Sequence, residues 1–485
     1  MLSSDLESKI RQLSPEKQVL LRQRLRRAAE PDAVYQIPRR SPSSPRVLSF
    51  GQQQLWLVDQ LSPGASAYNV PYPVRIRGNL NKLALQRALD AVVGRHEVLR
   101  TLFVELKGQP LPLVAKKWSV EMKEVDLSGL AESRQNSELP LLLKTDAARP
   151  FSLARELKLR TTLYRLAPDD YILLHVSHHI SWDLRSKIIF YEELSPFYDA
   201  FSQGKNCTLP EPPIQYADFA LWQRRYVDGA VLENLTAYWK QQLAGAPSKL
   251  ELPVDHVRPP VQKLNGAKYP MLLSEQTLDA VKRLSQETGV TLYMLLLSSL
   301  YVFLFCYTSE TDISIGSPFA GRRKETDAII GMFINTLVLR TKISDELTFR
   351  QIMARVRETT FGAIANQELP FEKIVETVRP PRDLSRNALF QVNFRVQNAA
   401  PAKVQLRGLE TESLDLVDND TAKFDLALEL PSSPMSRGYF EYNTDLLERK
   451  TVARMADDFH ALLAALIAAP DMRLTDLDVV RRIRR

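Results

Sequence analysis

The sequence has few cysteines and no long apolar run, and both absences limit what the protein can be. Cys207 and Cys306 are the only two cysteines in 485 residues, and they lie far apart without metal-ligand spacing. This usage argues against a disulfide scaffold and a cysteine-built metal site, and it indicates a reducing, cytoplasmic environment. The longest apolar run, residues 294–305, is shorter than the roughly 18 residues of a membrane span and contains two serines. The charged start "MLSSDLESKI" shows no export signal, so we expect no membrane association.

Motifs for several common chemistries are also missing. The sequence has no glycine-rich phosphate loop, no GxSxG nucleophile turn and no dinucleotide fingerprint. Its net charge is +7, but the basic clusters "RQRLRRAA" and "VVRRIRR" lie at the two ends, without interleaved aromatics or a nucleic-acid-binding motif. We interpret these clusters as solvated ends or as a docking surface for an acidic partner protein, and we expect no nucleic-acid binding.

The length and the segment pattern predict two α/β lobes. A chain of 485 residues exceeds one ordinary core, so two lobes of roughly 200 residues each are expected. Residues 1–47 combine the helical pattern "LSPEKQVLLRQRLRR" with a linker that contains four prolines. Strand-like and helix-like segments then alternate, which favours mixed sheets in lobes 48–250 and 251–485. The expected strands include 72–78, 157–166, 171–180 and 312–320, and the expected helices include 81–103, 186–201, 276–290 and 291–305.

A histidine-rich segment, "YILLHVSHHISWDL" at 171–184, carries the main candidate site. Alternation along a strand places His178 on one face with four aliphatic residues, and His179 on the other face with Ser177 and His175. His178 is therefore expected to be a core histidine that bonds to a backbone group. His179 closes the strand and is a candidate for proton transfer. Asp183 is expected to cap the following helix or to hold the turn through an ion pair.

A metal site is a weaker alternative for the same segment. His175, His179 and Asp183 resemble a set of two histidines and one carboxylate. In a strand, however, His175 and His179 are roughly 13 Å apart, which is too far for one ion to bridge. We therefore expect no metal here.

Further segments follow one another in the order typical of one family. They are "SFGQQQLWLVDQL", "RHEVLRTLF", "YADFALWQRR", "IGSPFAGR", "IGMFINTLVLR", "ELPFEKIVE" and "RDLSRNALFQVNF". Together with "HHISWDL", which is similar to an HHxxxDG motif, they make residues 48–485 resemble the condensation domains of non-ribosomal peptide synthetases. The initial "LSPEKQVLLRQRL" resembles the segment that tethers such a domain to an upstream carrier protein.

This resemblance implies a fold and a reaction. The fold would be two chloramphenicol acetyltransferase-like lobes arranged as a V, with a tunnel and the active site at their junction. An upstream acyl or peptidyl thioester and a downstream aminoacyl thioester, each on the phosphopantetheine of a peptidyl carrier protein, would be joined through an amide bond. The resemblance also implies a monomer without a cofactor of its own, beside an adenylation domain, in secondary-metabolite and antibiotic biosynthesis.

The resemblance assigns roles residue by residue. It makes His179 the catalytic histidine, His178 its structural neighbour and Asp183 a loop-holding aspartate whose partner is an arginine, for which Arg100 is our candidate. It identifies no substrate-binding residue. Leu184 stands where the motif has glycine, so the turn must adopt a conformation that leucine accepts. In this respect the chain is similar to a subgroup that handles modified residues and assists the dehydration of a seryl or threonyl unit.

Two other functions remain open. A non-catalytic module of the same fold that recruits carriers or enzymes is expected to lose the second histidine, and His179 is present. A free-standing acyltransferase that uses coenzyme A or a small amine would need no docking helix, and the "LSPEK" segment speaks against it. Within the family, a cyclisation domain would carry two aspartates instead of the paired histidines, and an epimerisation domain would lack "RDLSRNALFQVNF" in this form.

Overall fold

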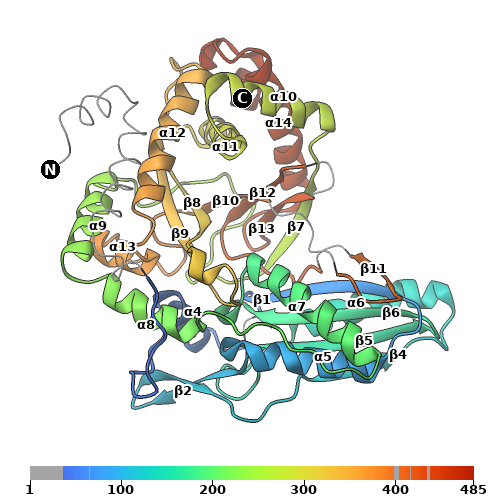
Figure 1. Cartoon of the computed structure of the whole chain (residues 1–485). Helices are drawn as coiled ribbons and strands as arrows, with labels where there is room; N and C mark the ends of the chain where they lie inside the picture. Colours follow the sequence, from blue (N-terminus) through green and yellow to red (C-terminus); the bar gives the residue numbers. More distant parts are fainter. Residues whose placement is uncertain (1–35, 65, 398–403, 415–416, 434–436, 485) are drawn as a thin grey trace.

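The computed structural model describes residues 36–64, 66–397, 404–414, 417–433 and 437–484. The predicted tethering helix within residues 1–30 lies outside the described residues. Two layered lobes make up the chain, and each is built around one sheet (Figure 1). Among the described residues, no single helix is long and apolar enough to cross a membrane, and α10 (Glu275–Thr288) and α11 (Leu292–Thr308) pass that test only as a pair bent by 103°.

The first lobe has a five-stranded sheet in the order β11-β1-β6-β5-β4. Its strands are β1 (Asn69–Arg77), β4 (Met122–Asp126), β5 (Leu159–Ala167), β6 (Asp170–His178) and β11 (Glu410–Ser413). Its main helices are α4 (Phe50–Leu61), α5 (Lys82–Arg95), α6 (Glu132–Ala148), α7 (Leu184–Ser202) and α8 (Tyr216–Tyr226). Alternate residues of β6 enter different cores, Leu173 under α5 and α7 and Leu174 on the α6 side, so both faces of this sheet are covered.

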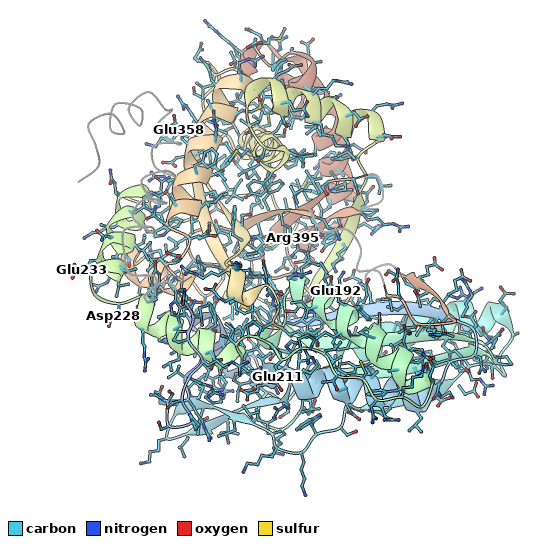
Figure 2. The ribbon with its side chains drawn as sticks, viewed as in Figure 1. Glu192, Glu211, Asp228, Glu233, Glu358 and Arg395 are labelled. Carbon is cyan, nitrogen blue, oxygen red and sulfur yellow. The ribbon has the colours of Figure 1, made fainter. Side chains whose placement is uncertain are left out.

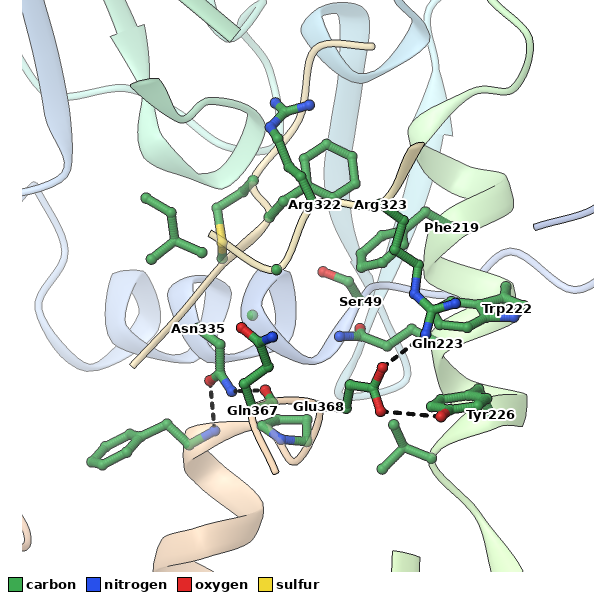
Figure 3. Close-up of a pocket in the computed structure, with 18 of the residues that line it drawn as sticks. Ser49, Phe219, Trp222, Gln223, Tyr226, Arg322, Arg323, Asn335, Gln367 and Glu368 are labelled. Atoms are coloured by element: carbon green, nitrogen blue, oxygen red, sulfur yellow. Dashed lines mark hydrogen bonds and ion pairs between the residues drawn. The ribbon is translucent and has the colours of Figure 1, made fainter. Parts of the chain in front are cut away.

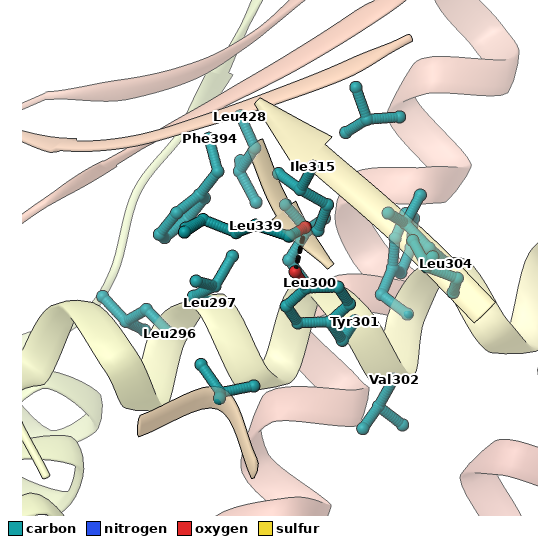
Figure 4. Close-up of a cluster of buried hydrophobic side chains, with 14 of the residues drawn as sticks. Leu296, Leu297, Leu300, Tyr301, Val302, Leu304, Ile315, Leu339, Phe394 and Leu428 are labelled. Atoms are coloured by element: carbon teal, nitrogen blue, oxygen red, sulfur yellow. Dashed lines mark hydrogen bonds between the residues drawn. The ribbon is translucent and has the colours of Figure 1, made fainter. Parts of the chain in front are cut away.

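The second lobe has a six-stranded mixed sheet in the order β7-β13-β12-β10-β8-β9. Its strands are β7 (Gly266–Met271), β8 (Asp312–Ala320), β9 (Ile334–Lys342), β10 (Val392–Gln397), β12 (Leu426–Pro431) and β13 (Gly438–Asn443). Helices α10, α11, α12 (Phe349–Ala365) and α14 (Arg449–Ala468) belong to the same lobe. Leucines of α11 pack against Ile315 and Phe394, and the Tyr301 hydroxyl donates to the Leu339 carbonyl at 2.6 Å (Figure 4). The apolar run at 294–305 is therefore a core helix.

Two segments cross the predicted boundary near residue 250. Strand β11 pairs antiparallel with β1 of the first lobe, although it follows β10 in the chain. In the other direction, Trp239 of α9 (Gly229–Gln242) is fully buried in the second-lobe core. The other four strands of the five-stranded sheet precede residue 250, and all strands of the six-stranded sheet follow it. These two exchanges connect the lobes.

The expected helix over 81–103 is shorter in the structure. Helix α5 ends at Arg95, and η1 (Glu97–Arg100) and β2 (Thr101–Leu106) follow. The apolar spacing continues past Arg95 because Val98 and Leu99 are also buried. These two residues, however, lie in a single 3₁₀ turn and not in the helix. The other expected strands and helices correspond to elements of the structure, with ends shifted by a few residues.

Candidate active site at the junction of the two lobes

His178 is the last residue of β6 and belongs to the packed side of the strand. Its Nδ1 accepts a hydrogen bond from the Ile180 N–H at 3.1 Å, and the ring lies edge-on to Phe151 at 5.8 Å. Its neighbours of the same parity, such as Leu174 and Val176, are in the core on the α6 side of the sheet. The predicted orientation of His178 and its backbone partner are confirmed. Desolvation lowers its pKa well below the ordinary value, so the ring is neutral.

His179 leaves the strand and begins the short helix η2 (His179–Ser181). Its N–H donates to the Tyr68 carbonyl at 2.9 Å, and its carbonyl accepts from the Trp182 N–H at 3.2 Å. These bonds fix the backbone, whereas Nδ1 of the ring has no hydrogen-bond partner among the described residues. The residue is only partly buried. Nδ1 itself is buried, so the exposed part of this fixed imidazole is the part that can meet a substrate.

The environment keeps the His179 imidazole neutral. Desolvation lowers its pKa to about 4, and the positive charges of Lys423 and Arg395 act in the same direction. The carboxylate of Asp183 opposes this shift but does not overcome it. At neutral pH the ring can therefore accept a proton or a hydrogen bond.

His175 does not join His179, although the alternation predicted a shared face. His175 lies under α7, with its ring centre 4.8 Å from that of Trp182 and 4.7 Å from that of Phe190. The alternation does not extend to His179, because the strand ends at His178 and His179 begins η2. Burial lowers the pKa of His175 to about 3. Within the described ranges, no three His, Cys, Asp or Glu side chains gather in a way that could hold a metal ion.

Asp183 performs both of the roles expected from the sequence. Its Oδ1 accepts from the Ser186 N–H at 2.8 Å and so caps α7. The same carboxylate forms a two-pronged ion pair with Arg322, at 2.7 Å from Nη2 to Oδ1 and 3.0 Å from Nε to Oδ2. Both side chains are almost fully buried, and Arg322 Nη1 also donates to the Ile329 carbonyl at 2.9 Å. The pair thus ties residues 322–329 of the second lobe to the start of α7.

Arg100, our candidate partner for Asp183, is elsewhere, and that prediction was wrong. Its guanidinium donates to the Ala115 carbonyl at 2.7 Å and lies 4.5 Å from the ring centre of Trp118. Arg100 ends η1 and reaches the residue that follows β3 (Gln109–Val114), because the chain turns at residue 100 instead of continuing as a helix. The true partner, Arg322, ends the segment "IGSPFAGR", so a motif already recognised in the sequence contained it.

Leu184 occupies the first turn of α7 and is 44% exposed. It is not among the non-glycine residues with positive φ, so its backbone needs no glycine. The expectation that the turn accepts leucine is confirmed, and the side chain projects from the helix start next to Asp183.

A cavity of about 400 Å³ lies at the lobe junction (Figure 3). Its lining comes from α4, α8, residues 321–336 and residues 367–372. Arg323 pairs with Glu368 at 2.7 Å, and the Tyr226 hydroxyl donates to the same carboxylate at 3.0 Å. Burial raises the pKa of Glu372, another lining residue, to about 7. These residues were not identified from the sequence, although motif segments supply them and Phe219, Trp222 and Tyr226 have helical spacing.

His179 does not line this cavity, but α4 connects the two places. Ser49 and Gly51 line the cavity, while the neighbouring Gln52 side chain donates to the Ile180 carbonyl of η2 at 3.3 Å. The cavity and His179 therefore lie on different sides of the first turn of α4.

The sequence is similar to proteins of one family over most of its length. The condensation domain family matches residues 45–483. One of the linear gramicidin synthase proteins of Brevibacillus parabrevis is 40% identical over 441 residues, which are 90% of this chain and 8% of that protein. Phosphinothricin tripeptide synthetase PhsC of Streptomyces viridochromogenes is 38% identical over 481 residues, 99% of this chain and 44% of that protein. The chain spans less than half the length of these curated relatives.

Solved structures of the same architecture confirm the predicted mixed α/β fold. The X-domain from teicoplanin biosynthesis aligns with a TM-score of 0.83 and 25% identity, over 91% of this chain and 99% of that chain. A further structure is of an X-domain in complex with OxyB. The first condensation domain of the calcium-dependent antibiotic synthetase aligns with a TM-score of 0.74 and 22% identity, over 90% of this chain and all of the other.

Proposed function

Because the chain belongs to the condensation domain family, we propose that it is an acyltransferase that forms an amide bond between two carrier-bound substrates. The upstream carrier protein presents an acyl or peptidyl thioester, and the downstream carrier presents an aminoacyl thioester. The downstream amine attacks the upstream carbonyl carbon, a C–N bond forms and the C–S bond breaks. The upstream arm leaves as a thiol, and the product stays on the downstream arm.

The His179 imidazole is the observation that carries this proposal. The ring is neutral and partly accessible, and its Nδ1 is buried without a hydrogen-bond partner in the described part of the chain. Such a ring can accept the proton that the amine loses and pass it to the departing thiolate, or it can orient the amine. A thioester is already activated and both reactants are tethered, so positioning supplies much of the acceleration and no cysteine or serine nucleophile is needed.

Asp183 and Arg322 act as positioning residues in this proposal. Their ion pair fixes the helix start that follows η2, and it joins that start to the second lobe. A buried two-pronged pair is geometrically specific, so it holds the histidine segment in one place relative to both lobes. His178 supports the same segment through its bond to the Ile180 N–H.

The cavity beside α4 fits the phosphopantetheine arm of one carrier. Its lining combines aromatic rings with carboxylate, amide and guanidinium groups, which suits an arm that alternates methylene and amide groups. The arm belongs to the carrier protein, so the domain needs no cofactor of its own. A neighbouring adenylation domain would load the downstream carrier, and the domain itself would work as a monomer.

A recruiting module is the second candidate function, because the X-domain fold is so similar and one X-domain is known in complex with OxyB. In that role the domain would bind carriers or enzymes without forming an amide. The presence of His179 favours catalysis over recruitment. The free-standing acyltransferase would instead accept coenzyme A thioesters in the absence of any carrier.

A single-turnover assay separates these functions. Acyl-loaded upstream carrier and seryl- or threonyl-loaded downstream carrier are mixed with the domain, and intact-protein mass spectrometry follows the downstream carrier. We expect the wild type to form the amide product. With His179→Ala we expect the rate to fall by at least roughly 100-fold. A product lighter by one water would mark the dehydrating subgroup. Carriers that bind but give no amide with several acyl donors would favour the recruiting module.

A further inference from the structure

Residues 418–423, which lead into β12 of the second lobe, are held against the first lobe. Asn419 Nδ2 donates to the Ser66 carbonyl at 3.1 Å, and the Asp420 carboxylate pairs with Lys144 of α6 at 2.6 Å. One hydrogen bond and one ion pair thus fix this segment beside the residues that precede β1. The segment therefore delivers its last residue, a lysine, to the first lobe at a defined place.

That lysine, Lys423, lies beside the backbone that carries His179. Its Nζ is 4.3 Å from the ring centre of Tyr68, and the carbonyl of the same tyrosine accepts the His179 N–H at 2.9 Å. The centre of the Tyr68 ring is also 6.5 Å from that of His178. Among the charged groups that act on the His179 imidazole, the Lys423 ammonium has the largest effect. The second lobe therefore places a cation next to the proposed catalytic histidine.

The Lys423 ammonium has no anion of its own. Within the described ranges, no carboxylate oxygen lies within 4 Å of its Nζ. Glu441 of β13 and Lys268 of β7 lie opposite each other on the second-lobe sheet, and their charges act on Lys423 in opposite directions, while Arg395 acts with Lys268. Desolvation lowers the pKa of Lys423 to about 8, although its side chain is partly exposed. A poorly solvated cation without a partner is stabilised strongly by an anion that reaches it.

The other cation that acts on His179, Arg395, is already engaged on the same charged face of the second-lobe sheet. Arg395 Nη2 donates to the Tyr439 hydroxyl at 2.7 Å, and that hydroxyl donates to Glu429 at 2.9 Å. Arg395 Nε pairs with the same carboxylate, and the three residues are cross-strand neighbours on β10, β12 and β13. Arg395 lies between the two lobes (Figure 2). Of these two cations, Lys423 is the one that remains available for a negative charge on the substrate.

We propose that Lys423 stabilises the negative charge that develops on the thioester oxygen when the amine attacks. The inference rests on the proposed function. As the C–N bond forms, the π electrons of the carbonyl move onto oxygen, and the amine proton passes to His179. When the C=O bond forms again, the C–S bond breaks and the thiolate takes that proton. An ammonium group that is fixed in place and poorly solvated stabilises such an oxyanion more strongly than water does.

Single-turnover rates at saturating downstream carrier test the role of the charge. Lys423→Met should lower this rate by roughly 100-fold and leave the half-saturating concentration unchanged. Lys423→Arg keeps a cation, so its rate should stay within about tenfold of the wild type. Lys82→Met is the matched control, because Lys82 rests on the ring of Tyr171 at the other end of β6. Asn419→Ala removes a contact between the lobes without removing a charge, and it should keep the saturating rate.

The pH dependence distinguishes a contact with the oxyanion from an effect through His179. Lys423 loses its proton as the pH rises from about 7 to about 9, whereas an arginine does not. Relative to Lys423→Arg, the wild-type rate should therefore fall over this range, and the Lys423→Met rate should stay low. If Lys423 acted only by keeping His179 neutral, the Lys423→Met rate would rise to that of Lys423→Arg, and this result would overturn the proposal.

Binding of an anionic analogue separates this proposal from the proposed function. A pantetheine phosphonate has a negative charge on a tetrahedral centre, and the corresponding amide is neutral and planar. Neither transfers an acyl group, so calorimetry measures their affinity whether or not the protein forms an amide. Lys423→Met should weaken binding of the phosphonate roughly tenfold and leave binding of the amide unchanged. Equal affinity of the wild type and Lys423→Met for the phosphonate, or an equal loss in Asn419→Ala, would overturn the proposal.

Discussion

The two sheets of the molecule are covered differently. In the first lobe, consecutive residues of β6 such as Leu173 and Leu174 enter two different apolar cores. In the second lobe, Phe394 of β10 is buried under the helices, whereas the next residue, Arg395, belongs to a charged face. The first sheet thus has an apolar core on both faces where it delivers His179, while the second carries charged and polar side chains on the face opposite its apolar core. The difference suggests that one lobe supplies the reacting group and the other supplies recognition.

The link between the lobes should be the most sensitive point of this arrangement. Removing one partner of a buried ion pair leaves the other charge unpaired, which costs roughly 3–5 kcal/mol. We therefore expect Arg322→Ala to lower the free energy of unfolding by about that amount, measured by urea denaturation. Arg100→Ala, which loses hydrogen bonds to two backbone carbonyls and a stacking contact, should cost about 1 kcal/mol.

A double-mutant cycle adds the control for this prediction. Asp183→Asn combined with Arg322→Ala should show a strong coupling energy, whereas Asp183→Asn combined with Arg100→Ala should be additive. If both arginines coupled equally to Asp183, the lobes would not be joined by the Asp183–Arg322 pair.

Acid should weaken the first lobe more than the second. Desolvation holds the pKa of His175 at about 3 and that of His179 at about 4, and it lowers that of His178 as well. An unfolded histidine titrates near about 6.5, so below that pH the unfolded chain binds protons that the folded chain refuses. The contribution of these buried, neutral histidines to the free energy of unfolding is fully present above about pH 6.5 and is lost as the pH falls toward 4.

Hydrogen exchange followed by mass spectrometry checks the acid prediction lobe by lobe. After correction for the intrinsic exchange rate, protection of β5 and β6 should decline between pH 6.5 and 4.5. Protection of α11 and β12 should decline less, because the second-lobe histidines, His256 and His460, are not fully buried. His175→Phe should reduce the decline in β6. An equal loss of protection in both lobes would contradict the expectation that acid weakens the first lobe more.

The smallest effect is expected at Leu184, which lies beside the site but outside both cores. The side chain is largely exposed at a helix start, so Leu184→Gly should cost no more than about 1 kcal/mol of stability. We expect condensation to continue in this variant and any dehydration of a seryl unit to diminish, as read from the mass of the product. Equal dehydration by the wild type and by Leu184→Gly would show that Leu184 does not contribute to the dehydration.

Local patterns in the sequence were sufficient for much of the first sheet and its histidines. Alternation placed His178 correctly because β6 is a regular strand up to that residue. The alternation does not apply to His179, because the strand ends at His178 and alternation alone does not show where a strand ends. The apolar run of α11 was recognisable as too short for a membrane span, and its burial on all sides explains its composition.

The remaining parts of the site depend on distant contacts. Asp183 and Arg322 are 139 residues apart, and the local sequence around either residue does not indicate its partner. The charged face of the second sheet combines β7, β10, β12 and β13, and its strand order was not predictable from the segment pattern. The cavity beside α4 likewise needs four separate segments to meet. The motif segments contain Asp183, Arg322 and much of the cavity lining, but only the fold brings these residues together.

The most direct test of the proposed division between lobes compares His179→Ala with Arg395→Met in one experiment. Single-turnover rates are measured over a range of concentrations of the loaded downstream carrier. We predict that His179→Ala lowers the rate at saturation and leaves the half-saturating concentration unchanged. Arg395→Met should chiefly raise the half-saturating concentration or change the side-chain preference. A His179→Ala variant that forms the amide at the wild-type rate would contradict the account.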